Sequence, residues 1–135
     1  MRKLYVWLRY LIALVIGFHG LVYLISPFWV TFQEWKGVSL LLGGTVSTQS
    51  LKAISTGLWV VAGISLLGAA LTIALASLVP GWWRPIAIMG GLAGAVSFAV
   101  FWDGQMQQFT NQGGVGMIIS LVIVGSAVAF AHAFG

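Results

Sequence analysis

Three polar side chains share one face of the first apolar segment: His19, Tyr23 and Ser26. Their spacing of four and then three residues places them above one another on a helix. His19 follows Arg9 by about ten residues, which is roughly 15 Å along a helix and close to the middle of a bilayer-spanning segment. An ionisable group at that depth is costly, usually faces the bundle interior and often marks a functional site. The stripe therefore predicts a ligand-binding site at His19, Tyr23 and Ser26.

Two interpretations of His19 remain open from the residues alone. In the first, the neutral imidazole bonds a facing Ser, Thr or carbonyl group and only fixes how the helices pack. In the second, the ring binds a ligand or handles a proton. A neutral imidazole offers one donor and one acceptor, which suits a carbonyl or hydroxyl group on a lipophilic molecule.

The two carboxylates of the chain, Glu34 and Asp103, are expected at the outer membrane interface. They could meet there and act as an acid–base or cation-binding pair. Alternatively, each is solvated or paired with Lys36 or Lys52. The glutamine- and asparagine-rich stretch after Asp103 is polar but fits no catalytic or metal-ligand spacing.

Cofactor chemistry finds little support in the sequence. The chain has no cysteine, which excludes disulfides, thiolate metal sites and iron–sulfur clusters. His132 lies near the end of the chain, at a different membrane depth from His19, so a haem held by both is not expected. No phosphate-binding loop, nucleophile elbow or H-E-x-x-H sequence is present. We expect no metal and no cofactor, assign no catalytic residue, and rank an enzyme acting alone below the other functions.

These residues belong to a chain that is 60% hydrophobic and only 6% charged. An ordinary soluble domain has about 25% charged residues, so the composition indicates a protein embedded in lipid. Six scattered basic residues do not form a nucleic-acid-binding patch. A spanning helix needs roughly 20 mainly apolar residues. The length therefore accommodates four spans with short loops and no separate soluble domain.

The predicted fold is all-α: one domain, 1–135, in which four transmembrane helices form an integral membrane bundle. The spans are expected at about 5–26, 53–79, 85–102 and 115–133, where apolar runs lie between proline, glycine and polar stretches. Small residues should mediate the helix contacts. They recur at helical spacing in the last three spans: Ser65, Ala69, Thr72 and Ala76; Gly90, Gly94 and Ser97; Gly116, Ser120, Ala127 and Ala131.

The charges predict an orientation in the membrane. Arg2, Lys3, Arg9 and Arg84 fall on one side of the predicted bundle, against Lys36 and Lys52 on the other. Lysine and arginine concentrate on the cytoplasmic side, so both termini are expected in the cytoplasm, with the chain in an inner or plasma membrane. The first external loop, 27–52, combines aromatic residues with a short apolar run, which is typical of a segment lying in the membrane interface.

The first helix resembles that of the DoxX-like family of small four-helix membrane proteins. The likeness rests on two runs, Leu8-Arg9-Tyr10-Leu11 and Gly17-Phe18-His19-Gly20-Leu21-Val22-Tyr23-Leu24. The glycine-containing segment 58–74 is similar to the second helix of the family. The resemblance implies a four-helix membrane bundle. Some members of the family are associated with quinone-linked oxidoreductases and others with stress responses.

Two functional hypotheses follow. In the first, the bundle binds a small lipophilic molecule, such as a quinone, an isoprenoid or another lipid, with His19 and Tyr23 as polar contacts. In the second, the chain is a non-catalytic accessory subunit of a larger membrane complex of respiration or electron transfer, or it associates with copies of itself. The polar stripe favours the first hypothesis, whereas the small size and the shortage of ionisable groups favour the second.

Overall fold

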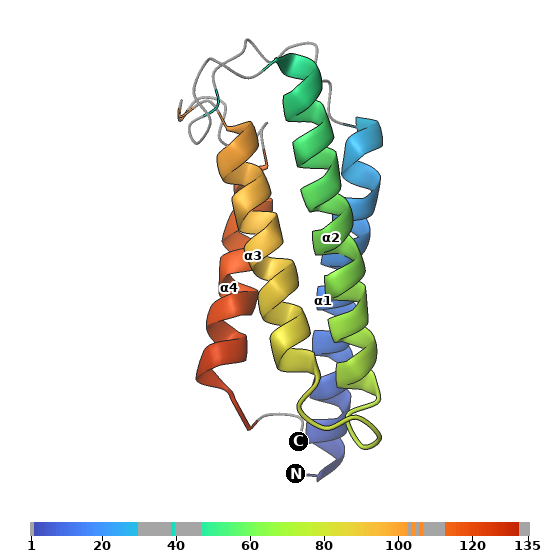
Figure 1. Ribbon diagram of the computed structural model, residues 1–135. Helices are drawn as coiled ribbons and strands as arrows, with labels where there is room; N and C mark the ends of the chain where they lie inside the picture. The colour runs from blue at the N-terminus through green and yellow to red at the C-terminus, as the bar shows by residue number, and fades with distance from the viewer. Residues whose placement is uncertain are drawn as a thin grey trace.

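The apolar runs of the sequence form four α-helices that lie side by side in the structure, a computed structural model (Figure 1). They are α1 (Arg2–Trp29), α2 (Thr48–Ala74), α3 (Trp83–Phe101) and α4 (Gly114–Ala129). The structure describes residues 2–29, 39, 47–102, 104, 106 and 113–132. The prediction of an all-α fold is confirmed for these residues.

Three of the helices, α1, α2 and α3, are long and apolar enough to cross a bilayer. α4 has 16 residues, or about 24 Å at 1.5 Å per residue, which is less than the roughly 30 Å of a hydrocarbon core. Large apolar side chains of α1 point outward; Trp7 is 74% exposed and Phe18 is 68% exposed. A continuous apolar surface of this kind marks contact with lipid or with another protein. Together these features are those of a membrane-spanning protein.

Local signals explain where the helices begin. Ser47 caps α2, because its side-chain oxygen accepts a hydrogen bond from the Ser50 amide at 3.2 Å. A serine in this position satisfies one of the amides that have no partner in the first turn. The helix therefore starts ahead of the apolar span predicted at 53–79. In α3, Pro85 occupies the first turn, where its missing N–H costs nothing.

The helix ends differ from the apolar spans by a few residues. α2 ends at Ala74, and turns lead from there to Pro80 and Gly81. The residue before a proline avoids the helical region, and Gly81 has a positive φ of 78°, which glycine adopts without strain. α1 continues through Pro27 to Trp29, and Pro27 removes one helical hydrogen bond from the last turn because it has no N–H.

The chain runs alternately up and down through the bundle (Figure 1). The start of α1, the α2–α3 turn and the end of α4 lie at one end of the bundle. Consecutive helices are neighbours, so α1 packs against α2, α2 against α3 and α3 against α4. Up-and-down topology with neighbouring antiparallel helices is typical of helical bundles.

Glycines allow the helices to approach closely. α1 and α2 cross at Gly20 and Gly63, where a Cβ atom on Gly20 would lie 2.9 Å from the Gly63 carbonyl oxygen. α2 and α3 meet at Gly90, and α3 meets α4 at Gly91, where a Cβ atom would lie 2.8 Å from the Ser120 carbonyl oxygen. Close backbone approach of this kind supplies much of the packing between helices in lipid.

Most of the small residues predicted to mediate helix contacts are buried within the bundle. Eight of them have this environment: Ser65, Ala69, Ala76, Gly90, Gly94, Ser97, Ser120 and Ala127. Thr72, Gly116 and Ala131 are partly buried. Of the predicted first external loop, 27–52, residues 27–29 belong to α1 and residues 48–52 belong to α2. Ser39, which is buried, and the cap Ser47 are also described, and the rest of the predicted interfacial segment lies outside the described residues.

Candidate functional site

Two side chains of α1 and one of α4 form a buried hydrogen-bond network. His19, Tyr23 and Ser120 are 6%, 7% and 0% exposed. His19 Nε2 lies 3.1 Å from Ser120 Oγ, and the Tyr23 hydroxyl lies 2.7 Å from the same oxygen. The Tyr23 hydroxyl also lies 3.4 Å from the Gly116 carbonyl oxygen, a second acceptor to which it can donate. We call His19, Tyr23 and Ser120 the polar network, which links α1 to α4.

The surrounding helices set the geometry of the polar network. The His19 and Tyr23 rings, one helical turn apart, make an edge contact with centroids 4.9 Å apart and an interplanar angle of 68°. Gly94 of α3 faces them so closely that a Cβ atom there would collide with the Tyr23 hydroxyl and lie 2.7 Å from Ser120 Oγ. The missing side chain of Gly94 therefore provides the space through which Tyr23 reaches α4.

Two hydrogen-bond arrangements satisfy the polar network. In one, Tyr23 donates to Ser120, and Ser120 donates to His19 Nε2, so the proton of a neutral ring is on Nδ1. In the other, His19 Nε2 donates to Ser120, Ser120 donates to Tyr23, and Tyr23 donates to Gly116. His19 bonds Ser120 through Nε2, and the ring also has a backbone hydrogen-bond partner in Gly116. Nδ1 would be a donor in the first arrangement and an acceptor in the second.

Two members of the polar network, His19 and Tyr23, line a cavity of about 430 Å³ bordered by all four helices, whereas Ser120 is not among the lining residues. The polar side chains that line it include His19, Tyr23, Ser26 and Ser97. The rest of the lining is mostly apolar, and none of the described lining residues carries a formal charge. Pockets for small molecules commonly have this size and this combination of apolar walls with a few polar groups. We call it the polar cavity.

Ser26, the third residue of the predicted stripe, lines the polar cavity but stands apart from the polar network. Its hydroxyl donates to the Val22 carbonyl oxygen of the same helix at 2.7 Å. Ser97 of α3 donates to the Gly94 carbonyl oxygen in the same manner, also at 2.7 Å. A serine bonded in this way keeps lone pairs that can accept a hydrogen bond. The structure thus places all three predicted residues along one cavity.

The other polar residues singled out by the sequence are not part of this cavity. Glu34 and Asp103 lie outside the described residues, so their pairing stays a prediction. Lys52 is exposed on α2, and His132 is exposed in the turn after α4. Within the described ranges, no group of three or more histidines and carboxylates could hold a metal ion.

Sequence reasoning assigned Ser120 to helix packing and did not identify it as the partner of His19 and Tyr23. A weak signal existed, because Ser120 and Ser126 are the two hydroxyl-bearing residues of α4. Choosing between them requires the depth and rotation of α4 relative to α1, which local sequence does not contain. Gly94 was likewise recognised as small, but its role beside Tyr23 depends on the packed structure.

No protein-family model, curated protein or solved structure matches the chain. The resemblance of the first helix to the DoxX-like family stays a prediction, and the chemistry of the site is argued from its own residues.

Proposed function

We propose that this chain is a four-span membrane protein that binds a small lipophilic molecule, such as a quinone or an isoprenoid, in the polar cavity. The observation that carries the proposal is the position of His19 and Tyr23, both bonded to Ser120, on the wall of an otherwise largely apolar cavity. A ligand carbonyl would accept a hydrogen bond from the N–H of the His19 ring, and a ligand hydroxyl could instead donate to a lone pair of Ser26 or Ser97. The lack of charge among the described lining residues favours an uncharged ligand, because burying an unpaired ion is costly.

The four-span topology is supported by the environment of α4. This helix packs along α3 and exposes apolar side chains such as Val122 and Val128, as a lipid-facing helix does. Arg84 and the first residues of α1 lie at the same end of the bundle. Because basic residues concentrate on the cytoplasmic side, we place both termini in the cytoplasm. The DoxX-like resemblance would fit a quinone, since some members of that family are associated with quinone-linked oxidoreductases.

Analysis of co-purified lipid tests the binding proposal. The purified wild-type chain should carry one neutral lipophile at near-stoichiometric amount, identified by mass spectrometry of its extracted lipids. His19→Leu removes both ring nitrogens while keeping an apolar side chain of comparable bulk. Ser120 stays bonded to Tyr23 in this variant, so no buried hydroxyl loses its last partner. His19→Leu should keep its helix content and lose the bound lipophile.

A matched pair of serine variants separates binding from folding. Ser120→Ala removes the centre of the polar network, whereas Ser65→Ala removes a hydroxyl of α2 that is also buried but is not part of the network. Lipid should fall in Ser120→Ala and stay at the wild-type level in Ser65→Ala. Unchanged lipid per folded molecule in His19→Leu and Ser120→Ala, together with a lowered melting temperature, would show that the polar network serves packing alone.

The accessory-subunit hypothesis has one specific observation in its favour. α1 is the least buried of the three long helices. Of an apolar stretch of 18 residues in each helix, 28% is buried in α1, 39% in α2 and 44% in α3. An edge helix with this much apolar surface offers contact area to a larger complex as well as to lipid. A stable larger partner that co-purifies from native membranes, with no stoichiometric lipid, would favour this hypothesis over ligand binding.

A further inference from the structure

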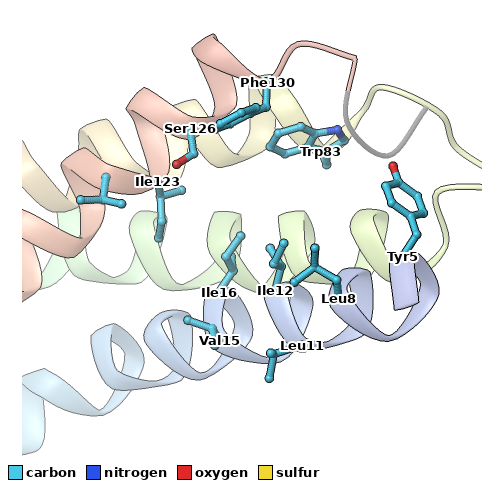
Figure 2. A pocket seen from close by; sticks show the side chains of 11 residues that line it. Tyr5, Leu8, Leu11, Ile12, Val15, Ile16, Trp83, Ile123, Ser126 and Phe130 are labelled. Carbon is cyan, nitrogen blue, oxygen red and sulfur yellow. The ribbon is translucent and has the colours of Figure 1, made fainter. Parts of the chain in front are cut away.

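A second cavity, of about 510 Å³, lies along the same seam between α1 and α4 (Figure 2). Side chains of the two helices face each other across it, and Tyr5, Trp83 and Phe130 stand at one end. Apart from Ser126 and two of these aromatic residues, its lining side chains are entirely hydrocarbon. We call it the apolar cavity.

The two cavities follow one another along the seam. On α1, residues between 5 and 16 line the apolar cavity and residues between 15 and 26 line the polar cavity. On α4 and its two capping residues, the corresponding ranges are 122–130 and 113–119, with Ser120 between them. Val15 lines both cavities and is 55% exposed. The two cavities therefore adjoin on the lipid-facing side of the polar network.

The two adjoining cavities together form one groove, and the chemistry of its lining changes along its length. Hydrogen-bonding groups gather in the polar cavity, whereas the apolar cavity offers almost only hydrocarbon. From His19 to Tyr5 the groove extends about 21 Å along α1, at 1.5 Å per residue. A polar head would gain hydrogen bonds only at the His19 end, and a long chain would find hydrocarbon contact toward the Tyr5 end. The described walls hold no ionic partner for a charged head.

Resting on the proposed function, we infer that the ligand is a neutral, long-chain amphiphile. Its hydroxyl or carbonyl head lies at the polar network, and its chain crosses Val15 into the apolar cavity toward Tyr5 and Phe130. A long-chain or isoprenoid alcohol or ketone has this chemistry. A fatty acid carboxylate and a phospholipid headgroup do not, since their charge would be buried without a counterion.

Two photoreactive forms of octadecanol test the orientation, with the full chain in phosphatidylcholine nanodiscs. One carries a diazirine beside the hydroxyl group, and the other carries it at the chain end. Mass spectrometry should locate adducts of the first at His19–Tyr23 and of the second at Leu8–Ile12 or Ser126–Phe130. Excess unlabelled octadecanol should lower both by about tenfold, as a saturable site requires. Octadecanoate at neutral pH should compete about tenfold less well, which corresponds to 1.4 kcal/mol of binding free energy.

Blocking the groove where the two cavities adjoin tests the path of the ligand chain, and a substitution at the neighbouring residue is the matched control. Val15→Trp places a large ring where the two cavities adjoin, whereas Leu14→Trp places it on a neighbouring outward position, 69% exposed, that lines neither cavity. Chain-end labelling of the apolar cavity should fall by about tenfold in Val15→Trp, a loss equivalent to 1.4 kcal/mol. It should be unchanged in Leu14→Trp. Circular dichroism of both variants confirms that each retains its helices.

The outcomes distinguish this inference from the proposed function. In one outcome, the first probe gives competed labelling at His19–Tyr23 and the chain-end probe labels Ser26 or Gly113. The hydrocarbon chain of the ligand would then run away from the apolar cavity, which would overturn this inference alone. Equal competition by octadecanoate would overturn the neutral head. Labelling spread over outward positions such as Leu14 and Leu21, without competition, would show only surrounding lipid and would overturn both proposals.

Discussion

At the scale of single residues, Ser120 is the shared hydrogen-bond partner of two side chains from α1. Hydrogen bonds between membrane helices contribute about 0.6 kcal/mol each on average. Two such bonds therefore stabilise the fold only modestly, although their directionality favours one rotation of α4. The same modest energy means that a ligand group competing for His19, which lines the polar cavity, would displace Ser120 from the ring at little cost.

Gly94 gives a stability prediction at this scale. In Gly94→Ala the added methyl group would collide with the Tyr23 hydroxyl, and overpacking of this kind typically costs about 1–3 kcal/mol. Gly125→Ala is the matched control, because a Cβ atom at Gly125 has no atom within 4 Å and alanine favours a helix by up to about 1 kcal/mol. Thermal melts followed by circular dichroism should show a lowered midpoint for Gly94→Ala and an unchanged or raised midpoint for Gly125→Ala.

Removing the Tyr23 hydroxyl tests whether its collision with the new methyl group causes the lowered melting midpoint of Gly94→Ala. Tyr23→Phe in the Gly94→Ala background relieves the nearest contact, although the ring carbon that bore the hydroxyl would still lie 2.7 Å from the new methyl group. Partial recovery of the melting midpoint is therefore expected. A double variant less stable than Gly94→Ala would show that the collision with the hydroxyl is not what destabilises the single variant.

At the scale of the helices, α1 has two unlike interfaces. Against α2 it makes backbone contact at Gly20 and Gly63, whereas it meets α4 through the long side chains of His19 and Tyr23. Long side chains hold the helix axes farther apart than glycines do. This difference explains why both cavities lie along the α1–α4 seam.

Arg84 links the start of α3 to the end of α4, and its Nε donates to the Ala127 carbonyl oxygen at 3.0 Å. This carbonyl belongs to the last turn, where backbone oxygens lack helical partners, and a positive charge there contributes about 0.3–1 kcal/mol. Arg84→Gln removes the charge, and Arg84→Lys keeps it. Hydrogen–deuterium exchange of the last turn of α4 should accelerate in Arg84→Gln and change less in Arg84→Lys. Equal exchange in Arg84→Gln and wild type would show that Arg84 does not stabilise this helix end.

At the scale of the whole molecule, the sequence predicts features that depend on neighbouring residues, such as the helices, and does not predict contacts that depend on how the helices pack. Apolar runs predict the helices, but hydropathy cannot mark the polar first turn of α2, which starts at Thr48 because Ser47 caps it. The common face of His19 and Tyr23 follows from helix geometry alone. Their partner Ser120 does not, because the rotation of α4 is set by its contacts with α3, including Gly91.

The orientation of the bundle rests on where its charges and helix ends lie. The chain has no cysteine, so single introduced cysteines report on one position each. Ser77 is exposed in the turn that follows α2, at the end of the bundle that also holds Lys3 and Arg84, and Gln49 is exposed at the opposite end. If the basic end is cytoplasmic, Gln49→Cys should react with a membrane-impermeant maleimide in intact cells, and Ser77→Cys should react only after permeabilisation. The reverse pattern would invert the topology, and labelling of both in intact cells would mean that α2 does not cross the membrane.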